Sequence, residues 1–224
     1  MGLIDKLVGV LAPYECLGCG QEGDIICAQC INLFPNMPER CYRCRRYSSS
    51  SLTCKKCRKV STLRRVQAVT DYEGLAKALV WRLKFSGAQT VAVHMASLMQ
   101  QHAAKILAND NFIFVPVPTT NKRARQRGYD QAGLLALELR RLTGAPALNC
   151  LARSGKAHQI GANRAVRLKQ LEGTFRVKRP RAVAGAHIVL IDDVVTTGTT
   201  LEVAAKAMRQ AGAKSIEAIV FAQP

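Results

Sequence analysis

The most informative segment of the chain reads Val189-Leu190-Ile191-Asp192-Asp193-Val194-Val195-Thr196-Thr197-Gly198-Thr199-Thr200. It begins with an uninterrupted apolar run, typical of a strand buried on both faces, and that run ends in two adjacent carboxylates. A turn rich in threonine and glycine follows, and the spacing of later apolar residues predicts a helix over 199–211. A phosphate or ribose group bound at such a strand–turn–helix junction would meet both backbone N–H groups and carboxylates.

Each polar residue of this segment has an expected task. Asp192 and Asp193 can accept hydrogen bonds from two ribose hydroxyls, directly or through a magnesium ion. Gly198 allows the backbone to approach a ligand closely. The N–H groups at the helix start are expected to bind a phosphate together with the hydroxyl groups of four threonines, Thr196, Thr197, Thr199 and Thr200. The segment therefore predicts a phosphate-and-ribose site.

Strands and helices alternate over residues 66–224. Apolar runs predict strands over 66–69, 112–115, 187–191 and 215–221. Helical spacing of leucine and alanine predicts helices over 72–83, 90–107, 131–142 and 199–211. The stretch 153–172 is polar and basic, without clear periodicity. This alternation predicts an α/β fold in which helices cover both faces of a parallel sheet.

Eight of the nine cysteines precede residue 58. This change of composition divides the chain into a cysteine-rich module, 1–65, and a domain, 66–224. The cysteines form four CxxC pairs: Cys16/Cys19, Cys27/Cys30, Cys41/Cys44 and Cys54/Cys57. Two such pairs complete a tetrahedral four-sulfur zinc site, so eight cysteines predict two structural Zn²⁺ sites. The order of pairing, consecutive or interleaved, stays open, and disulfides are a competing interpretation that a reducing compartment disfavours.

The formal net charge of +18 predicts attraction to polyanions, either nucleic acid or pyrophosphate-bearing ligands. A charge that serves only solubility is the alternative. Residues 1–12 have the pattern of a short amphipathic helix, and Asp5 within it argues against a signal peptide. No apolar run is long enough to span a bilayer. We therefore expect no transmembrane segment and a cytoplasmic location.

The segment 189–200 resembles, nearly residue for residue, the phosphoribosyl pyrophosphate (PRPP) signature of the type I phosphoribosyltransferases. Together with the four CxxC pairs, three further motifs are similar to those of the ComF family, which comprises the ComF/ComFC competence proteins and the GntX-like proteins. These motifs are Lys84-Phe85-Ser86-Gly87, Val115-Pro116-Val117-Pro118 and Arg127-Gly128-Tyr129-Asp130-Gln131. The resemblance runs from Cys16 to the last strand. It implies a type I phosphoribosyltransferase-like parallel sheet with a small N-terminal zinc-binding module.

The resemblance also implies the ligand, which would be PRPP or ribose-5-phosphate bound with Mg²⁺. It assigns Pro118, Thr119 and Thr120 to a pyrophosphate loop. It makes the stretch 153–170 a flap over the ligand. The anion contacts that it suggests are all basic side chains, namely Lys84, Arg127, Arg153, Arg164 and Arg167. A solvated basic surface is the alternative for these side chains.

Two functions follow from the resemblance. The first is a phosphoribosyltransferase with an unidentified acceptor; the second is a non-catalytic, PRPP-gated factor that handles DNA during its uptake or utilisation. Nucleic acid, especially single-stranded DNA, and proteins of the competence machinery are the implied partners. Basic residues are dense at 40–46, 55–59 and 122–127, whereas Tyr42 and Tyr47 are nearly alone as aromatic residues beside those arginines. We therefore expect any contact with DNA to be directed mainly at phosphates and to depend steeply on salt. No general acid or base is evident, and His158 is the histidine we would test.

Overall fold

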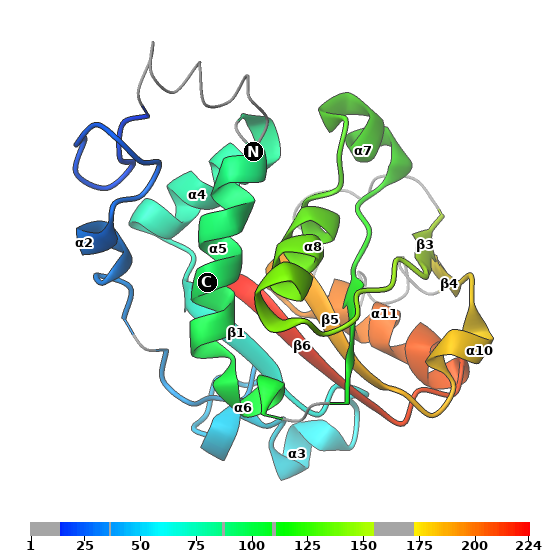
Figure 1. Ribbon diagram of the computed structural model, residues 1–224. Helices are drawn as coiled ribbons and strands as arrows, with labels where there is room; N and C mark the ends of the chain where they lie inside the picture. Colours follow the sequence, from blue (N-terminus) through cyan, green and yellow to red (C-terminus); the bar gives the residue numbers. More distant parts are fainter. Residues whose placement is uncertain (1–13, 36, 87, 109–110, 155–172) are drawn as a thin grey trace.

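The computed structural model describes residues 14–224 except 36, 87, 109–110 and 155–172 (Figure 1). At its centre lies a four-stranded sheet of order β1-β6-β5-β2, in which every neighbouring pair is parallel. Its strands are β1 (Val66–Asp71), β2 (Ile113–Pro116), β5 (His187–Val194) and β6 (Ser215–Gln223). A separate antiparallel pair consists of β3 (Leu151–Arg153) and β4 (Phe175–Val177).

Helices cover both faces of this sheet (Figure 1). They are α4 (Gly74–Phe85), α5 (Ala88–His102), α6 (Ala104–Leu107), α7 (Asn121–Arg127), α8 (Gln131–Thr143), α10 (Pro180–Val183) and α11 (Thr199–Gln210). Alternate residues of β5 enter different cores: Val189 and Ile191 pack with α4, α5 and α8, whereas Ile188 and Leu190 pack with α11. A strand buried on both faces must be apolar throughout, as the sequence indicated. The predicted α/β fold class is confirmed.

Some elements differ from those expected. The single helix predicted over 90–107 is two helices, α5 and α6, because Ala103 between them leaves the helical conformation. Helix α7 was not predicted, since only Ala124 interrupts its run of polar residues and it has no apolar face. It begins instead at a cap, where the Thr120 hydroxyl accepts a hydrogen bond from the Arg123 backbone N–H.

The cysteine-rich segment contributes to the core on both faces of the sheet. Its short helices are α2 (Ala28–Ile31), η1 (Ser49–Ser51) and α3 (Lys55–Arg58). Ile25 and Ile26 are fully buried in the core that holds α4 and α5, whereas Tyr42 and Leu63 are buried in the core that holds α11. The two halves of the segment therefore pack on opposite sides of the sheet.

Among the described ranges, no helix has both the length and the apolar character needed to cross a bilayer. The segment 1–12, for which a helix was predicted, lies outside those ranges.

Candidate functional site

A cleft of about 600 Å³ opens where β2 and β5 end. Ligands of open parallel sheets bind outside the carboxyl ends of the strands, so this is the expected place for a site. The cleft brings together eight of the predicted residues: Lys84, Pro118, Thr119, Arg127, Arg153, Asp192, Asp193 and Thr200. Six further residues line it: Phe85, Val117, Arg123, Gln126, Gln131 and Ala132.

The other predicted threonines lie beside the cleft rather than in its wall. Thr199 is buried, and its Oγ1 lies 2.8 Å from Oγ1 of Thr197. Thr196 is exposed, and Thr120 is buried as the cap of α7. Thr197 and Thr199 thus contact each other across Gly198, in the turn before α11. The flap residues Arg164 and Arg167, and His158, lie outside the described residues.

The two carboxylates at the end of β5 differ in their partners. Asp193 Oδ2 lies 2.6 Å from Lys84 Nζ in the last turn of α4, and both side chains are largely buried. Asp192 accepts a hydrogen bond from the Asp193 backbone N–H, at 2.9 Å. Burial and the neighbouring negative charge of Asp193 raise the pKa of Asp192 well above its usual range. A bound cation or ribose hydroxyls would stabilise the charged form of this pair.

Three arginine side chains, those of Arg123, Arg127 and Arg153, also line the cleft. Burial lowers the pKa of Arg127 and of Arg153, and repulsion from Arg123 lowers both further. Such repulsion among neighbouring guanidinium groups is relieved when an anion binds between them. The cleft therefore offers carboxylates for hydroxyl groups or a metal ion, and guanidinium groups for a phosphate or pyrophosphate.

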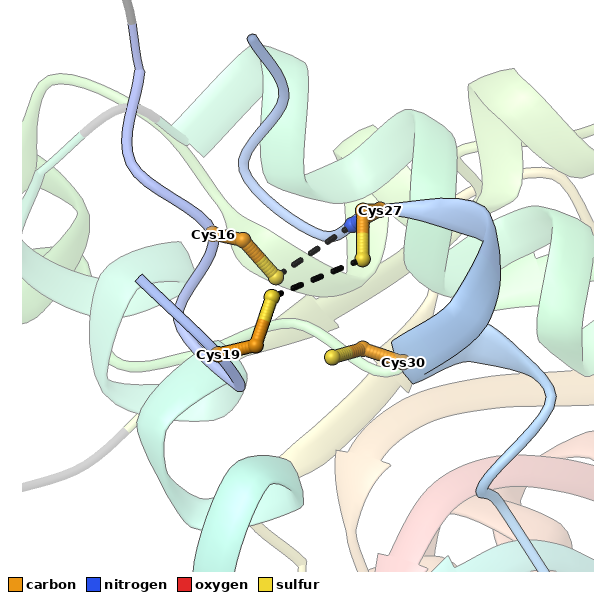
Figure 2. Close-up of side chains that lie close together, drawn as sticks. All are labelled: Cys16, Cys19, Cys27 and Cys30. Atoms are coloured by element: carbon orange, nitrogen blue, oxygen red, sulfur yellow. Dashed lines mark hydrogen bonds between the residues drawn. The ribbon is translucent and has the colours of Figure 1, made fainter. Parts of the chain in front are cut away.

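The eight N-terminal cysteines form two clusters. The members of each cluster are consecutive in the chain: Cys16, Cys19, Cys27 and Cys30 in the first, and Cys41, Cys44, Cys54 and Cys57 in the second. Figure 2 shows the first cluster, in which the four side chains point toward a common centre. This arrangement selects consecutive pairing from the two orders that the sequence left open.

Both clusters fit structural zinc. All four sulfur atoms of each cluster lie within 4.8 Å of one another. The Cys19 and Cys27 Sγ atoms are 3.8 Å apart, and those of Cys44 and Cys54 are 3.7 Å apart. A tetrahedral ZnS₄ centre with bonds of about 2.3 Å requires sulfur separations of about 3.8 Å. Burial raises the pKa of Cys16, but hydrogen bonds from neighbouring backbone N–H groups bring it down to about 6, whereas burial and the neighbouring thiols raise the pKa of Cys30 to about 12. A bound Zn²⁺ would stabilise all four thiolates together.

Comparison with known proteins decides the family. Residues 152–224 match the model of the phosphoribosyl transferase domain. Over 179 residues the chain is 31% identical to competence protein ComFC of Bacillus subtilis, covering 77% of this chain and 72% of that protein. The chain belongs to the ComF family. It is also 28% identical over 202 residues to DNA utilization protein YhgH of Salmonella typhimurium, covering 86% of this chain and 87% of the relative.

Among solved structures, the ComF-family chain has a partial likeness to the glutamine PRPP amidotransferase from B. subtilis. The TM-score is 0.42 at 19% identity, and the match covers 59% of this chain and 26% of the amidotransferase chain. The chain thus spans about a quarter of that enzyme's length.

In this ComF-family chain the motif 127–131 holds the cleft wall together. Gly128 ends α7 with a φ of 77°, a conformation that favours glycine. The Tyr129 hydroxyl donates a hydrogen bond to the Leu83 carbonyl at 2.9 Å, next to Lys84. Asp130 accepts hydrogen bonds from the backbone N–H groups of Thr119, at 2.7 Å, and Gly133, at 3.0 Å. The motif therefore ties the pyrophosphate-loop candidates to the ends of α4 and α8.

The turn before α11 is supported from behind by the cysteine-rich segment. Gly198 has a φ of 71°, and a Cβ atom there would lie 2.6 Å from Tyr42 Cε2. Glu202, 2% exposed, accepts hydrogen bonds from the Tyr42 hydroxyl at 2.6 Å, the Ser61 hydroxyl at 2.8 Å and the Thr62 N–H at 2.5 Å. Tyr42 is not available to stack on bases, because it is 2% exposed and fills this contact. Sequence patterns did not indicate the role of Tyr42 or Glu202.

The raised pKa of Asp192 gives the ligand-free ComF-family chain a pH-dependent stability. The folded state keeps the Asp192 proton to a higher pH than the unfolded state, in which the carboxyl titrates near about 3.9. Stability is therefore expected to fall as the pH rises from that value through the raised pKa. Asp192→Asn removes this penalty, so its melting temperature should exceed that of the parent at neutral pH and depend less on pH.

Thermal melts of the zinc-loaded protein between about pH 5 and pH 8 test this expectation. Asp71→Asn is the matched control, because it carries the same change at the end of β1, and any pH effect of the zinc sites affects both variants. Superimposable pH profiles for Asp192→Asn and the parent would show that Asp192 titrates normally.

Proposed function

We propose that this ComF-family chain binds PRPP with Mg²⁺ in the cleft at the ends of β2 and β5. The observation that carries the proposal is the juxtaposition of Asp192 and Asp193 with Lys84, Arg127 and Arg153 in one cleft. PRPP combines a ribose diol with a pyrophosphate, and these two groups require hydrogen-bond acceptors and cationic donors, respectively. Nucleoside diphosphates and dinucleotides also combine these two groups, and the resemblance of residues 189–200 to the PRPP signature favours PRPP among them.

The proposed roles follow the positions of the residues. Asp192 and Asp193 accept hydrogen bonds from the ribose hydroxyls, and they are the residues that would hold Mg²⁺, which when bound neutralises pyrophosphate charge. The start of α11 binds the 5′-phosphate with its backbone N–H groups and the polar residues of the turn, Thr196, Thr197, Gly198, Thr199 and Thr200. Pro118, Thr119 and Thr120 form the pyrophosphate loop. Arg164 and Arg167 remain proposed flap contacts.

We further propose that the cleft is phosphoribosyltransferase machinery in a protein of natural competence or DNA utilisation. The names of the ComFC and YhgH relatives and the net charge of +18 support the link to DNA. Single-stranded DNA and competence proteins would be partners, in the cytoplasm, where thiolates stay reduced for zinc. The division into a zinc module, 1–65, and a phosphoribosyltransferase-like domain, 66–224, belongs to this proposal.

The alternative is a non-catalytic factor in which PRPP gates the handling of DNA. One observation favours it: the described residues that line the cleft include no histidine or glutamate to serve as general acid or base for an acceptor. Catalysis in such a cleft would depend on positioning and on stabilising the charge of the departing pyrophosphate.

Calorimetric titration of Mg–PRPP into the zinc-loaded protein tests the binding proposal. The titration is repeated at two salt concentrations and in the presence of single-stranded DNA. We expect a dissociation constant of roughly micromolar order, equivalent to about −8 kcal/mol, that DNA does not change. Inorganic pyrophosphate, which lacks the ribose, should bind more weakly. If DNA or added salt abolished the binding, PRPP would be contacting only the basic surface, and the proposal would be wrong.

A further inference from the structure

Two aromatic side chains stand side by side on the outer face of α4. Trp81 is 57% exposed and Phe85 is 60% exposed, although large apolar side chains are normally buried. Their ring centroids lie 5.5 Å apart with an interplanar angle of 44°. The buried face of α4 is formed by Ala76, Leu79, Val80 and Leu83. The aromatic pair thus contributes little to the core, and its exposure calls for another explanation.

This pair lies at the edge of the cleft, beside helix α7. Phe85 lines the cleft, and the Arg127 guanidinium lies 5.1 Å from the centroid of the Phe85 ring. A guanidinium next to an aromatic face is typical of surfaces on which nucleobases stack, because both groups have flat π-faces. Trp81 does not line the cleft and lies one helical turn farther out.

Helix α7 supplies uncompensated positive charge next to the aromatic pair. Its four basic residues are Lys122, Arg123, Arg125 and Arg127, and it contains no acidic residue. Within the part of the chain that the structure describes, none of the four forms an ion pair with a carboxylate. Lys122 and Arg125 are exposed and lie outside the lining of the cleft. Lys122 and Arg125 can therefore contact the phosphates of a ligand that extends beyond the cleft.

We propose that Trp81, Phe85 and α7 form a binding site for single-stranded nucleic acid, in which a base stacks on the aromatic pair and backbone phosphates contact α7. The inference rests on the proposed use of DNA, but it does not require that PRPP binds. A duplex hides the faces of its bases, so an exposed stacking surface favours a single strand. A free nucleobase carries no phosphate and would leave Lys122 and Arg125 unused, which favours a strand over a small acceptor.

The competing location is the cysteine-rich segment. Tyr47 is 78% exposed there and directly follows Arg45 and Arg46. It is the other exposed aromatic side chain among the described residues. Tyr47→Ala is therefore the matched control for Trp81→Ala.

Trp81 is the only tryptophan of the chain, so its fluorescence reports directly on the proposed site. We expect a short oligothymidylate to quench this fluorescence. A strand of equal length that contains only abasic sugar-phosphate units offers the same charge without bases and should cause little quenching. Equal responses to both strands would overturn the stacking proposal. Quenching of equal strength by free thymidine would also overturn it, because it would indicate a small-molecule site.

Binding of a labelled oligothymidylate, measured by fluorescence anisotropy, tests the residues. Trp81→Ala is expected to weaken binding by roughly tenfold or more, and Tyr47→Ala by less than about twofold. Lys122→Ala with Arg125→Ala should reduce the salt dependence of binding. Phe85→Ala keeps Trp81, and oligothymidylate should quench the Trp81 fluorescence of this variant less than that of the parent. A larger loss in Tyr47→Ala than in Trp81→Ala would overturn the assignment.

Calorimetry with Mg–PRPP separates this inference from the proposed function. Trp81→Ala is expected to bind PRPP like the parent, because Trp81 lies outside the cleft lining. If the parent failed to bind PRPP while oligothymidylate still quenched Trp81, the PRPP proposal would fail and the strand-binding site would stand. If PRPP bound and oligothymidylate caused no quenching, the strand-binding proposal would fail and the PRPP proposal would stand.

Discussion

Replacement of Asp192 and Asp193 together by asparagine is expected to weaken the binding of Mg–PRPP by at least about a hundredfold. Each carboxylate would lose a charge-assisted hydrogen bond to a ribose hydroxyl, and such bonds contribute about 1.5–3 kcal/mol each. Two of them correspond to a factor of roughly a hundred or more in the dissociation constant. The double variant also leaves Lys84 without the carboxylate that lies 2.6 Å from its Nζ. Titration calorimetry gives the affinity directly.

The matched control is Asp71→Asn at the end of β1. Asp71 pairs with Arg40 at 2.8 Å, so its replacement also breaks an aspartate–cation pair at a strand end, but outside the cleft lining. We expect Asp71→Asn to bind PRPP within about twofold of the parent, and both variants to keep their zinc. Undiminished binding by the double variant would mean that the ribose site has been assigned to the wrong carboxylates.

Loss of the second zinc site is expected to have the next largest effect. Cys44→Ser should reduce the zinc content from two ions per chain to one and lower the melting temperature, since structural zinc contributes roughly 10 kcal/mol or more to folding in zinc-finger peptides. It should also weaken PRPP binding by at least about tenfold. The reason is that Tyr42, next to the ligand Cys41, supports the turn at Gly198 and is hydrogen-bonded to Glu202.

Cys19→Ser in the first zinc site is the matched variant. Cys19 and Cys44 are both exposed, and each is the second cysteine of the first CxxC pair in its cluster. Both variants should lose one zinc ion, measured by mass spectrometry of the metal, but Cys19→Ser should retain most of its PRPP affinity. Equal losses of affinity would indicate general destabilisation rather than local support of the turn by Tyr42.

The sequence predicted those features that depend on neighbours in the chain. The apolar run of β5, its terminal carboxylates and the start of α11 lie within one short segment, so local spacing was enough to place them. Each CxxC pair could likewise be recognised from its local spacing. Which two pairs form one zinc site depends on tertiary structure and could not be predicted. Spacing also carried an unused signal on α4. Because Leu79 and Leu83 face the core, Trp81 and Phe85, two residues farther along the helix in each case, must face outward.

Features that depend on distant contacts had no local pattern. Tyr42 and Glu202 are 160 residues apart, and neither a tyrosine within a CxxC pair nor a glutamate near a helix start predicts a buried hydrogen bond. Helix α7 lacked apolar periodicity because its side chains face solvent or the cleft rather than a core. Thr120 belonged to the expected pyrophosphate loop, but its side chain caps α7.

The contact between Gly198 and Tyr42 links how these two positions can change during evolution. Any side chain at residue 198 would collide with the Tyr42 ring. A residue other than glycine there would also have to adopt a left-handed backbone conformation. A relative that replaces Gly198 would therefore need a smaller residue at position 42, and it would then lose a donor to Glu202. Positions 42, 198 and 202 should vary together across the family, although the first lies in the cysteine-rich segment and the others in the part of the chain that matches the phosphoribosyl transferase domain.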